Sequence, residues 1–198
     1  YLSPSVACSV LYGLYNKFGE HHIAAVDINA ACTGYIYALQ QANDYLKDKP
    51  NKRVLAITAE AMSKKIDHDD FNTAFLFADA ATATIVVGND YLSTSKAKIR
   101  NITLSANGGD PDILSIPLND TVILKGKQLF MSAVKYMSKS LHQCCQQLGL
   151  EFTDLDTIIP HQANQRITSA IEKKLKFNKN SLYSNIENYG NTSSSTIP

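Results

Sequence analysis

Short apolar segments alternate with amphipathic helical segments along this chain of 198 residues, and that alternation limits the possible folds more than any other feature. The apolar segments, which we expect to be strands, are residues 23–29, 53–59, 75–77, 81–87 and 156–160. Helical patterns follow Pro4 and occupy residues 32–47, 127–148 and 162–176. Strands that alternate with helices are typical of α/β folds with mostly parallel sheets buried on both faces.

The clearest helical pattern is the one from Lys127 to Leu148. Its apolar residues, from Phe130 onward, are spaced by four and three in turn, which places them on one face of a helix. The polar segment 89–98 is expected to be a linker, and residues 107–111 a loop.

The composition excludes several classes of protein. Apolar residues make up 44% and charged residues 19%, which is ordinary globular usage and does not fit a wholly disordered chain. The formal net charge is +1, so nothing in the overall charge favours binding to nucleic acid or to an anionic membrane. No apolar run is long enough to span a bilayer, because the best candidate, residues 75–88, has Asp79 in its middle.

The four cysteines favour a reducing compartment, for which the cytoplasm is the simplest choice. They are too few and too unevenly spaced for a disulfide scaffold, and none forms a CxxC pair. Cys144 and Cys145 lie near His142, but their spacing suits no tetrahedral metal site, so we assign them to packing and expect no metal.

Cys32 is the first candidate for chemistry, because it follows an apolar segment and opens a helix in the sequence VDINAAC. The positive end of a helix dipole favours a thiolate and lowers the pKa of a thiol from about 8.5 towards neutrality. The alternative is that Cys32 is a buried core cysteine, as most free cysteines are.

His161 and Asn191 are the other two candidates. His161 ends the apolar segment TIIPH, also at a predicted junction of strand and helix, where a neutral imidazole can donate a hydrogen bond to an oxyanion. Asn191 lies in the sequence YGNTSSS, where its amide could do the same. Taken alone, a single histidine is more often an ordinary polar residue, and Gly-Asn-Thr-Ser is a turn and helix-capping pattern.

Three sequence blocks, VDINAACTGYIYAL, PHQANQRI and YGNTSSSTIP, together resemble the β-ketoacyl-acyl carrier protein synthase III family of the thiolase-like superfamily. The resemblance implies a layered αβαβα fold of two related halves, here residues 1–92 and 93–198. It makes Cys32 the acyl-accepting nucleophile, with His161 and Asn191 completing the triad. Because the chain starts at Tyr1 and lacks the family's terminal segments, including the loop that supplies a second oxyanion-hole amide, we expect it to be incomplete at both ends.

Some positions depart from the family pattern and concern the substrate. Phe71 stands where relatives carry an arginine that holds the nucleotide end of CoA, and phenylalanine cannot make that contact. Gly126, followed by lysine instead of asparagine, stands where relatives touch the substrate's pantetheine arm, and Asn164 is a further substrate-binding residue that the resemblance implies. Ser3 is small where relatives often have a bulky residue that closes the partner's acyl pocket. Ordinary drift would explain these differences equally well.

Basic residues follow His161, and three of them are candidates for docking an acidic acyl carrier protein: Arg166, Lys173 and Lys174. A local basic patch would steer such a partner. The default interpretation of a charge run is a solvated helix face.

The family resemblance predicts an acyltransferase. It would condense an acyl primer, from acyl-CoA or an acyl carrier protein, with malonyl-acyl carrier protein in fatty acid or related biosynthesis. It would need no cofactor beyond CoA or phosphopantetheine thioesters as substrates, and it would act as a cytoplasmic homodimer. Two alternatives remain: transfer of the acyl group to a hydroxyl or amine, and a role as a non-catalytic dimer partner.

Overall fold

The computed structural model describes residues 3–20, 22–118, 120–177 and 181–198. The chain divides into two compact units, of which the first ends at Ala30 and the second holds Ala31–Pro198. Every element named below belongs to one of these two units.

The first unit contains helix α1, Val6–Phe18, which confirms the helix predicted after Pro4. Its amino end is capped twice. The Ser5 hydroxyl accepts a hydrogen bond from the Cys8 N–H, and the Asp27 carboxylate accepts the N–H groups of Val6 and Ala7 at 2.7 and 2.8 Å. A carboxylate at this end also suits the helix dipole.

The buried strand predicted at residues 23–29 is wrong. This segment forms no regular secondary structure and pairs with no described strand, and Val26 is 71% exposed. Apolar residues favour a strand only where a neighbouring backbone completes its hydrogen bonds. In this unit, Asp27 of the segment caps α1 instead.

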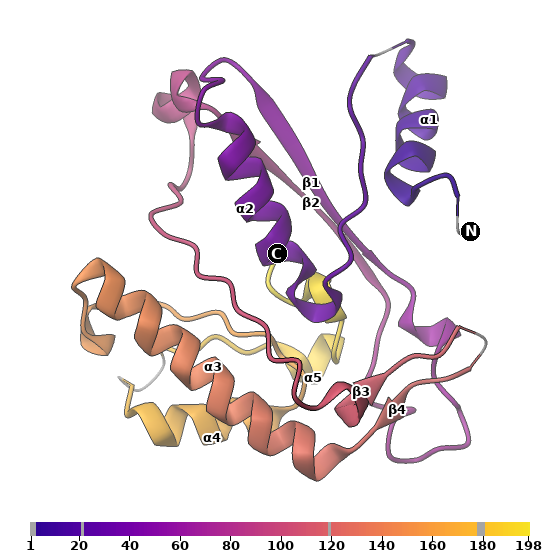
Figure 1. Ribbon diagram of the computed structural model, residues 1–198, viewed down its shortest axis with the longest axis vertical. Helices are drawn as coiled ribbons and strands as arrows, with labels where there is room; N and C mark the ends of the chain where they lie inside the picture. The colour runs from indigo at the N-terminus through magenta and orange to yellow at the C-terminus, as the bar shows by residue number, and fades with distance from the viewer. Residues whose placement is uncertain (1–2, 21, 119, 178–180) are drawn as a thin grey trace. The chain divides into compact units, whose positions relative to one another are not determined.

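The second unit begins with the short 3₁₀ helix η1, Ala31–Thr33, which leads directly into helix α2, Gly34–Leu46. Strands β1, Arg53–Glu60, and β2, Ala80–Val87, form an antiparallel pair in which Thr58 lies opposite Thr82. Helix α2 packs along this pair (Figure 1). The Tyr35 hydroxyl on α2 lies 3.2 Å from that of Thr84 on β2. Alternate β1 residues are buried, namely Ala56 and Thr58, as expected for a strand covered on one face.

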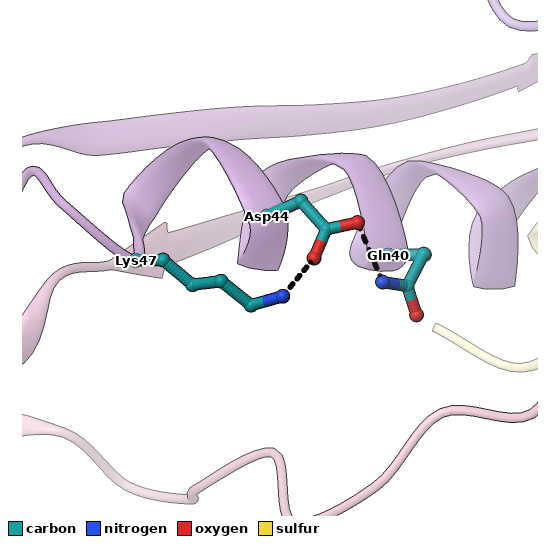
Figure 2. Close-up of polar contacts among 3 residues, drawn as sticks. All are labelled: Gln40, Asp44 and Lys47. Atoms are coloured by element: carbon teal, nitrogen blue, oxygen red, sulfur yellow. Dashed lines mark hydrogen bonds and ion pairs between the residues drawn. The ribbon is translucent and has the colours of Figure 1, made fainter.

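The outer surface of α2 carries the polar contacts drawn in Figure 2. The Asp44 carboxylate accepts hydrogen bonds from Gln40, one turn earlier, and from Lys47, both at 2.7 Å. These contacts lower the pKa of Asp44, with the Lys47 contact contributing most. Such exposed pairs support a helix only weakly, so α2 depends mainly on its contact with the strands.

Helix α3, Gly126–Leu148, confirms the predicted long amphipathic helix, and it packs against α4, Gln165–Leu175 (Figure 1). The helix predicted at residues 162–176 begins at Gln165, three residues later than expected, because the Asn164 side chain caps its amino end. The remaining elements are short: β3 (Leu114–Ser115), β4 (Ile123–Leu124), α5 (Ile186–Tyr189), η2 (Met62–Lys64), η3 (Asn89–Thr94), η4 (Pro111–Ile113), η5 (Phe152–Asp154) and η6 (Ser193–Thr196). Part of the predicted linker 89–98 is thus the helix η3.

The expected sheets were mostly parallel or mixed, and the strands that the structure describes pair in antiparallel fashion, β1 with β2 and β3 with β4. Within the described ranges, parallel pairing is limited to two isolated bridges, Phe77 with Asn191 and Ile158 with Leu182. The strands predicted at residues 75–77 and 156–160 are reduced to these bridges. The loop predicted at residues 107–111 is confirmed as far as Asp110, after which η4 begins.

Candidate active site

Cys32 lies near the amino end of α2, two residues before Gly34, the first residue of that helix. It is the middle residue of η1, and the preceding Ala31 has a φ of 46°. A positive φ is uncommon for a residue other than glycine, and such conformations cluster at functional sites. The backbone thus turns sharply to present Cys32 at the amino end of the helix.

Asn191 is buried, and its backbone is fixed on both sides. Its N–H donates to the Leu76 carbonyl at 2.8 Å, and its own carbonyl accepts the Ala78 N–H at 3.0 Å. The side-chain Oδ1 accepts the Ser193 N–H at 2.9 Å. That bond leaves the two donors of the Asn191 Nδ2 group to serve another acceptor.

Ser193 links Asn191 to Cys32. Its hydroxyl donates to the Cys32 Sγ at 3.6 Å, while its N–H is held by Asn191. Ser193 has a φ of 51°, so a second non-glycine residue with positive φ lies at this place. Figure 1 shows the carboxyl-terminal segment, in yellow, beside the start of α2, in agreement with the contact between η6 and η1.

The segment that carries Ser193 is anchored to the two strands by hydroxyl groups. The Ser195 hydroxyl lies 2.8 Å from that of Thr58, which in turn lies 2.6 Å from that of Thr82. The Glu60 carboxylate, at the end of β1, accepts both the N–H and the hydroxyl of Ser194. Buried polar groups are costly unless they are hydrogen-bonded, and here each hydroxyl has a partner.

The expectation of a lowered pKa for Cys32 is wrong. Burial raises the pKa of the Cys32 thiol above its usual value, and the negative charge of Glu60 adds to the rise. The hydrogen bond from Ser193 acts in the opposite direction but does not cancel the effect of burial. Desolvation of the thiolate is therefore the largest influence on the pKa of Cys32.

His161 is deeply placed, and burial lowers its pKa to about 4. The imidazole is therefore neutral at neutral pH, as we expected for a hydrogen-bond donor. Its Nδ1 is buried and makes no hydrogen bond within the described part of the chain. The hydrogen bonds that join Cys32, Ser193 and Asn191 do not extend to this atom.

Sequence reasoning missed Gln162, which is only 1% exposed. Its Oε1 accepts the Asn185 N–H at 2.8 Å and the Ser184 hydroxyl at 3.3 Å, and its Nε2 donates to the Asn185 Oδ1 at 3.0 Å. Gln162 thus ties the segment next to His161 to the one that leads into α5 and Asn191. The only signal in the sequence was a polar residue between two apolar patterns.

The predicted substrate-binding residues lie in different surroundings. The Asn164 side chain caps α4, accepting the Arg166 N–H at 2.9 Å. Gly126 is exposed at the first position of α3, and Ser3 is exposed in the first unit. Phe71 is 86% exposed on a turn that is closed by hydrogen bonds from Asn72 and Thr73 to Asp70.

The predicted docking residues share one helix. Arg166, Lys173 and Lys174 are exposed on α4. Arg166 and Lys173 are seven residues apart and so lie on the same face of α4. Among the described side chains, none of the three is paired with a carboxylate.

Two features are absent from the residues that the structure describes. No group of three or more His, Cys, Asp or Glu residues is placed to hold a metal ion. In the same residues, no helix has the length and apolar character needed to cross a membrane.

Comparison with known proteins places this arrangement in a family. The 3-oxoacyl-[acyl-carrier-protein] synthase III family matches residues 26–108, and the carboxyl-terminal part of that family matches residues 145–198. The β-ketoacyl-[acyl-carrier-protein] synthase III of Clostridium acetobutylicum is 36% identical over 210 residues, which cover 99% of this chain and 62% of that protein.

Solved structures agree. The crystal structure of 3-oxoacyl-[acyl-carrier-protein] synthase III from Aquifex aeolicus VF5 matches with a TM-score of 0.88 at 36% identity, covering 100% of this chain and 62% of that one. The enzyme of the same name from Pseudomonas aeruginosa PAO1 gives 0.88 at 27% identity, with the same coverage. The chain therefore spans about 62% of the length of these relatives.

The fold class is thus confirmed as that of the thiolase-like α/β enzymes, with a cysteine at the start of a helix. Within that class, this chain belongs to the 3-oxoacyl-[acyl-carrier-protein] synthase III family.

Proposed function

We propose that the protein carrying this chain condenses an acyl primer with malonyl-acyl carrier protein, with loss of CO2, to give a 3-oxoacyl-acyl carrier protein. The observation that supports this best is the contact between the Ser193 hydroxyl and the Cys32 Sγ, because it joins the Asn191 segment to the candidate nucleophile. The names of the related proteins point to the same activity.

In the first step of the proposed reaction, the Cys32 sulfur attacks the carbonyl carbon of the primer thioester. The new carbon–sulfur bond forms as the bond to the leaving thiol breaks, and the proton of Cys32 goes to that leaving thiolate. The result is an acyl-Cys32 enzyme and a free thiol.

In the second step, the bond between the malonyl carboxylate and its neighbouring carbon breaks, and CO2 leaves. The electron pair passes into an enolate, whose oxygen needs neutral donors that stabilise charge. The Asn191 Nδ2 group and the neutral His161 imidazole are the residues that we assign to this task. The enolate carbon then attacks the acyl-Cys32 carbonyl, the bond to the Cys32 sulfur breaks, and the departing thiolate takes a proton from solvent water.

We assign docking of the acyl carrier protein to Arg166, Lys173 and Lys174. Three exposed cations on one helix, none of them paired with a described carboxylate, suit an acidic partner. Binding of substrate by Asn164, Gly126, Phe71 and Ser3, the division into halves at residues 92 and 93, the homodimer and the cytoplasmic location stay predictions from the family resemblance.

The test is intact-protein mass spectrometry. The protein is incubated first with a panel of acyl-CoAs and acyl carrier proteins, and then with malonyl-acyl carrier protein. We expect an acyl adduct that then disappears into a 3-oxoacyl product. The Cys32→Ala variant should form neither the adduct nor the product. Cys8→Ala is the matched control, because Cys8 is the exposed cysteine of the first unit, and it should retain both.

Each other outcome would change the assignment. An adduct that resists malonyl-acyl carrier protein but is discharged by a hydroxyl or amine acceptor would identify an enzyme that transfers the acyl group to such an acceptor without condensation. Product formation that survives Cys32→Ala would identify a non-catalytic partner and contradict the nucleophile assignment.

A further inference from the structure

The carboxylate of Glu60 occupies a position that the proposed mechanism does not use. Glu60 ends β1 and is half-buried. One of its oxygens, Oε1, accepts both the Ser194 N–H, at 3.2 Å, and the Ser194 hydroxyl. A charged acceptor makes the stronger kind of hydrogen bond, so this is the firmest polar attachment of the Ser193–Ser195 segment to the strands.

We propose that Glu60 is a positioning residue of this site, whose carboxylate fixes the Ser193–Ser195 segment and through it the groups that contact Cys32. This inference rests on the proposed function only in taking Cys32 as the nucleophile.

Ser194 and Ser193 connect Glu60 to Cys32. Ser194 lies against the start of α2, since a methyl group on Gly34 would be only 3.5 Å from the Ser194 Cβ. The preceding residue, Ser193, donates its hydroxyl to the Cys32 Sγ and its N–H to the Asn191 Oδ1. Fixing the position of Ser194 therefore fixes the contact of Ser193 with the Cys32 sulfur and the orientation of the Asn191 amide.

The charge of Glu60 supplies a second effect, which separates it from an ordinary structural contact. Helix α2 and η6 both pack on η1, and η6 carries only hydroxyl side chains. In the described residues, Glu60 is the charged group that acts on the Cys32 thiol, and it acts to raise the pKa of that thiol. Removing the charge while keeping the acceptor should therefore change the titration of Cys32 without releasing the segment.

Three variants separate the two effects. Glu60→Gln keeps an oxygen that can accept from Ser194 but loses the charge. Glu60→Ala loses both. Ser194→Ala keeps the Glu60 charge and the backbone hydrogen bond but loses the hydroxyl.

Two measurements on the protein that carries this chain use no substrate, so their failure is distinct from a failure of the proposed function. The first is the pH dependence of iodoacetamide alkylation at Cys32, followed by peptide mass spectrometry. We expect its midpoint to fall by about 0.5–1 pH unit in both Glu60 variants and to stay in place in Ser194→Ala. The second is hydrogen exchange of the peptide that covers residues 190–196. We expect exchange about tenfold faster in Glu60→Ala and near that of the parent in Glu60→Gln.

Either of two results would overturn the proposal. One is a Glu60→Gln variant with an unchanged alkylation midpoint. The other is unchanged exchange of the 190–196 peptide in Glu60→Ala or, if that variant does not fold, in Ser194→Ala.

Discussion

Replacing Gly190 by alanine perturbs the turn that delivers Asn191 to the site. Gly190 has φ 68° and ψ −161°, a conformation that is essentially open only to glycine. A Cβ at this position would lie 3.3 Å from the Leu76 carbonyl oxygen. The backbone cannot move away easily, because the Gly190 N–H donates to the Ile186 carbonyl and the Asn191 N–H to that of Leu76, both at 2.8 Å.

The expected loss of stability follows from the backbone conformation of Gly190 and from the contact of the added Cβ with Leu76. A residue held in such a sparsely populated region costs about 1–3 kcal/mol, and the tight contact with Leu76 places Gly190→Ala near the upper end. For a chain of this length, each kcal/mol lowers Tm by about 2–4 °C, so we expect a loss of about 6–12 °C. Gly149→Ala is the matched control: Gly149 also has a positive φ, 66°, but among the described residues no atom beyond its chain neighbours would lie within 4 Å of an added Cβ. That change should cost about 1 kcal/mol.

The assays are thermal unfolding, followed by circular dichroism, and formation of the 3-oxoacyl product. We expect Gly190→Ala to lose both stability and condensation, because the displaced turn carries Asn191. Gly149→Ala should lose a little stability and keep its activity, since it ends α3 far along the chain from Asn191. If Gly190→Ala were no less stable than Gly149→Ala, or kept full activity, the argument from this turn would be refuted.

Two further predictions concern charge. Burial lowers the pKa of His161 from 6.5 to about 4. Below about pH 6.5, His161 therefore binds a proton in the unfolded chain but not in the folded chain. His161 therefore removes stability as the pH falls from about 6.5 to 4, by up to about 3 kcal/mol, and His161→Gln should reduce this loss in urea unfolding curves measured at pH 7.5 and 4.5. An unchanged loss in that variant would contradict the burial of the imidazole. The double reversal Arg166→Glu with Lys173→Glu should raise the KM for malonyl-acyl carrier protein about tenfold at low salt and leave that for acyl-CoA unchanged. Lys98→Glu, at an exposed site outside α4, should alter neither, and an equal effect from it would remove the case for docking on α4.

The helices could be predicted from the sequence because their signal is local. The spacing of apolar residues between Phe130 and Leu148 is a property of one helix, and α3 ends at Leu148, the last residue of that pattern. The strands predicted at residues 23–29 and 156–160 did not form as expected, because a strand depends on a partner elsewhere in the chain. Ile158 finds one residue to pair with, Leu182, and residues 23–29 find none among the described strands.

The same distinction applies to the site. The positions of Cys32 and Asn191 were visible as short motifs, and the structure brings them together through Ser193. Glu60 and Gln162 were not visible, because each is a polar residue at the edge of an apolar pattern. The contact of Glu60 with Ser194 spans 134 positions in the chain, and nothing in the residues around Glu60 indicates it.

The protonation of Cys32 shows how a local argument can fail through distant groups. The helix dipole follows from the sequence, and alone it favours a thiolate. Burial and Glu60 both come from the folded arrangement, and together they raise the pKa of Cys32. Under the proposed condensation, this suits a resting enzyme whose thiol ionises only as the primer thioester is attacked, because the negative charge then passes at once to the leaving group. The neutral His161 and the amide of Asn191 fit the same surroundings, since each can stabilise an enolate oxygen without bringing a full charge into a buried site.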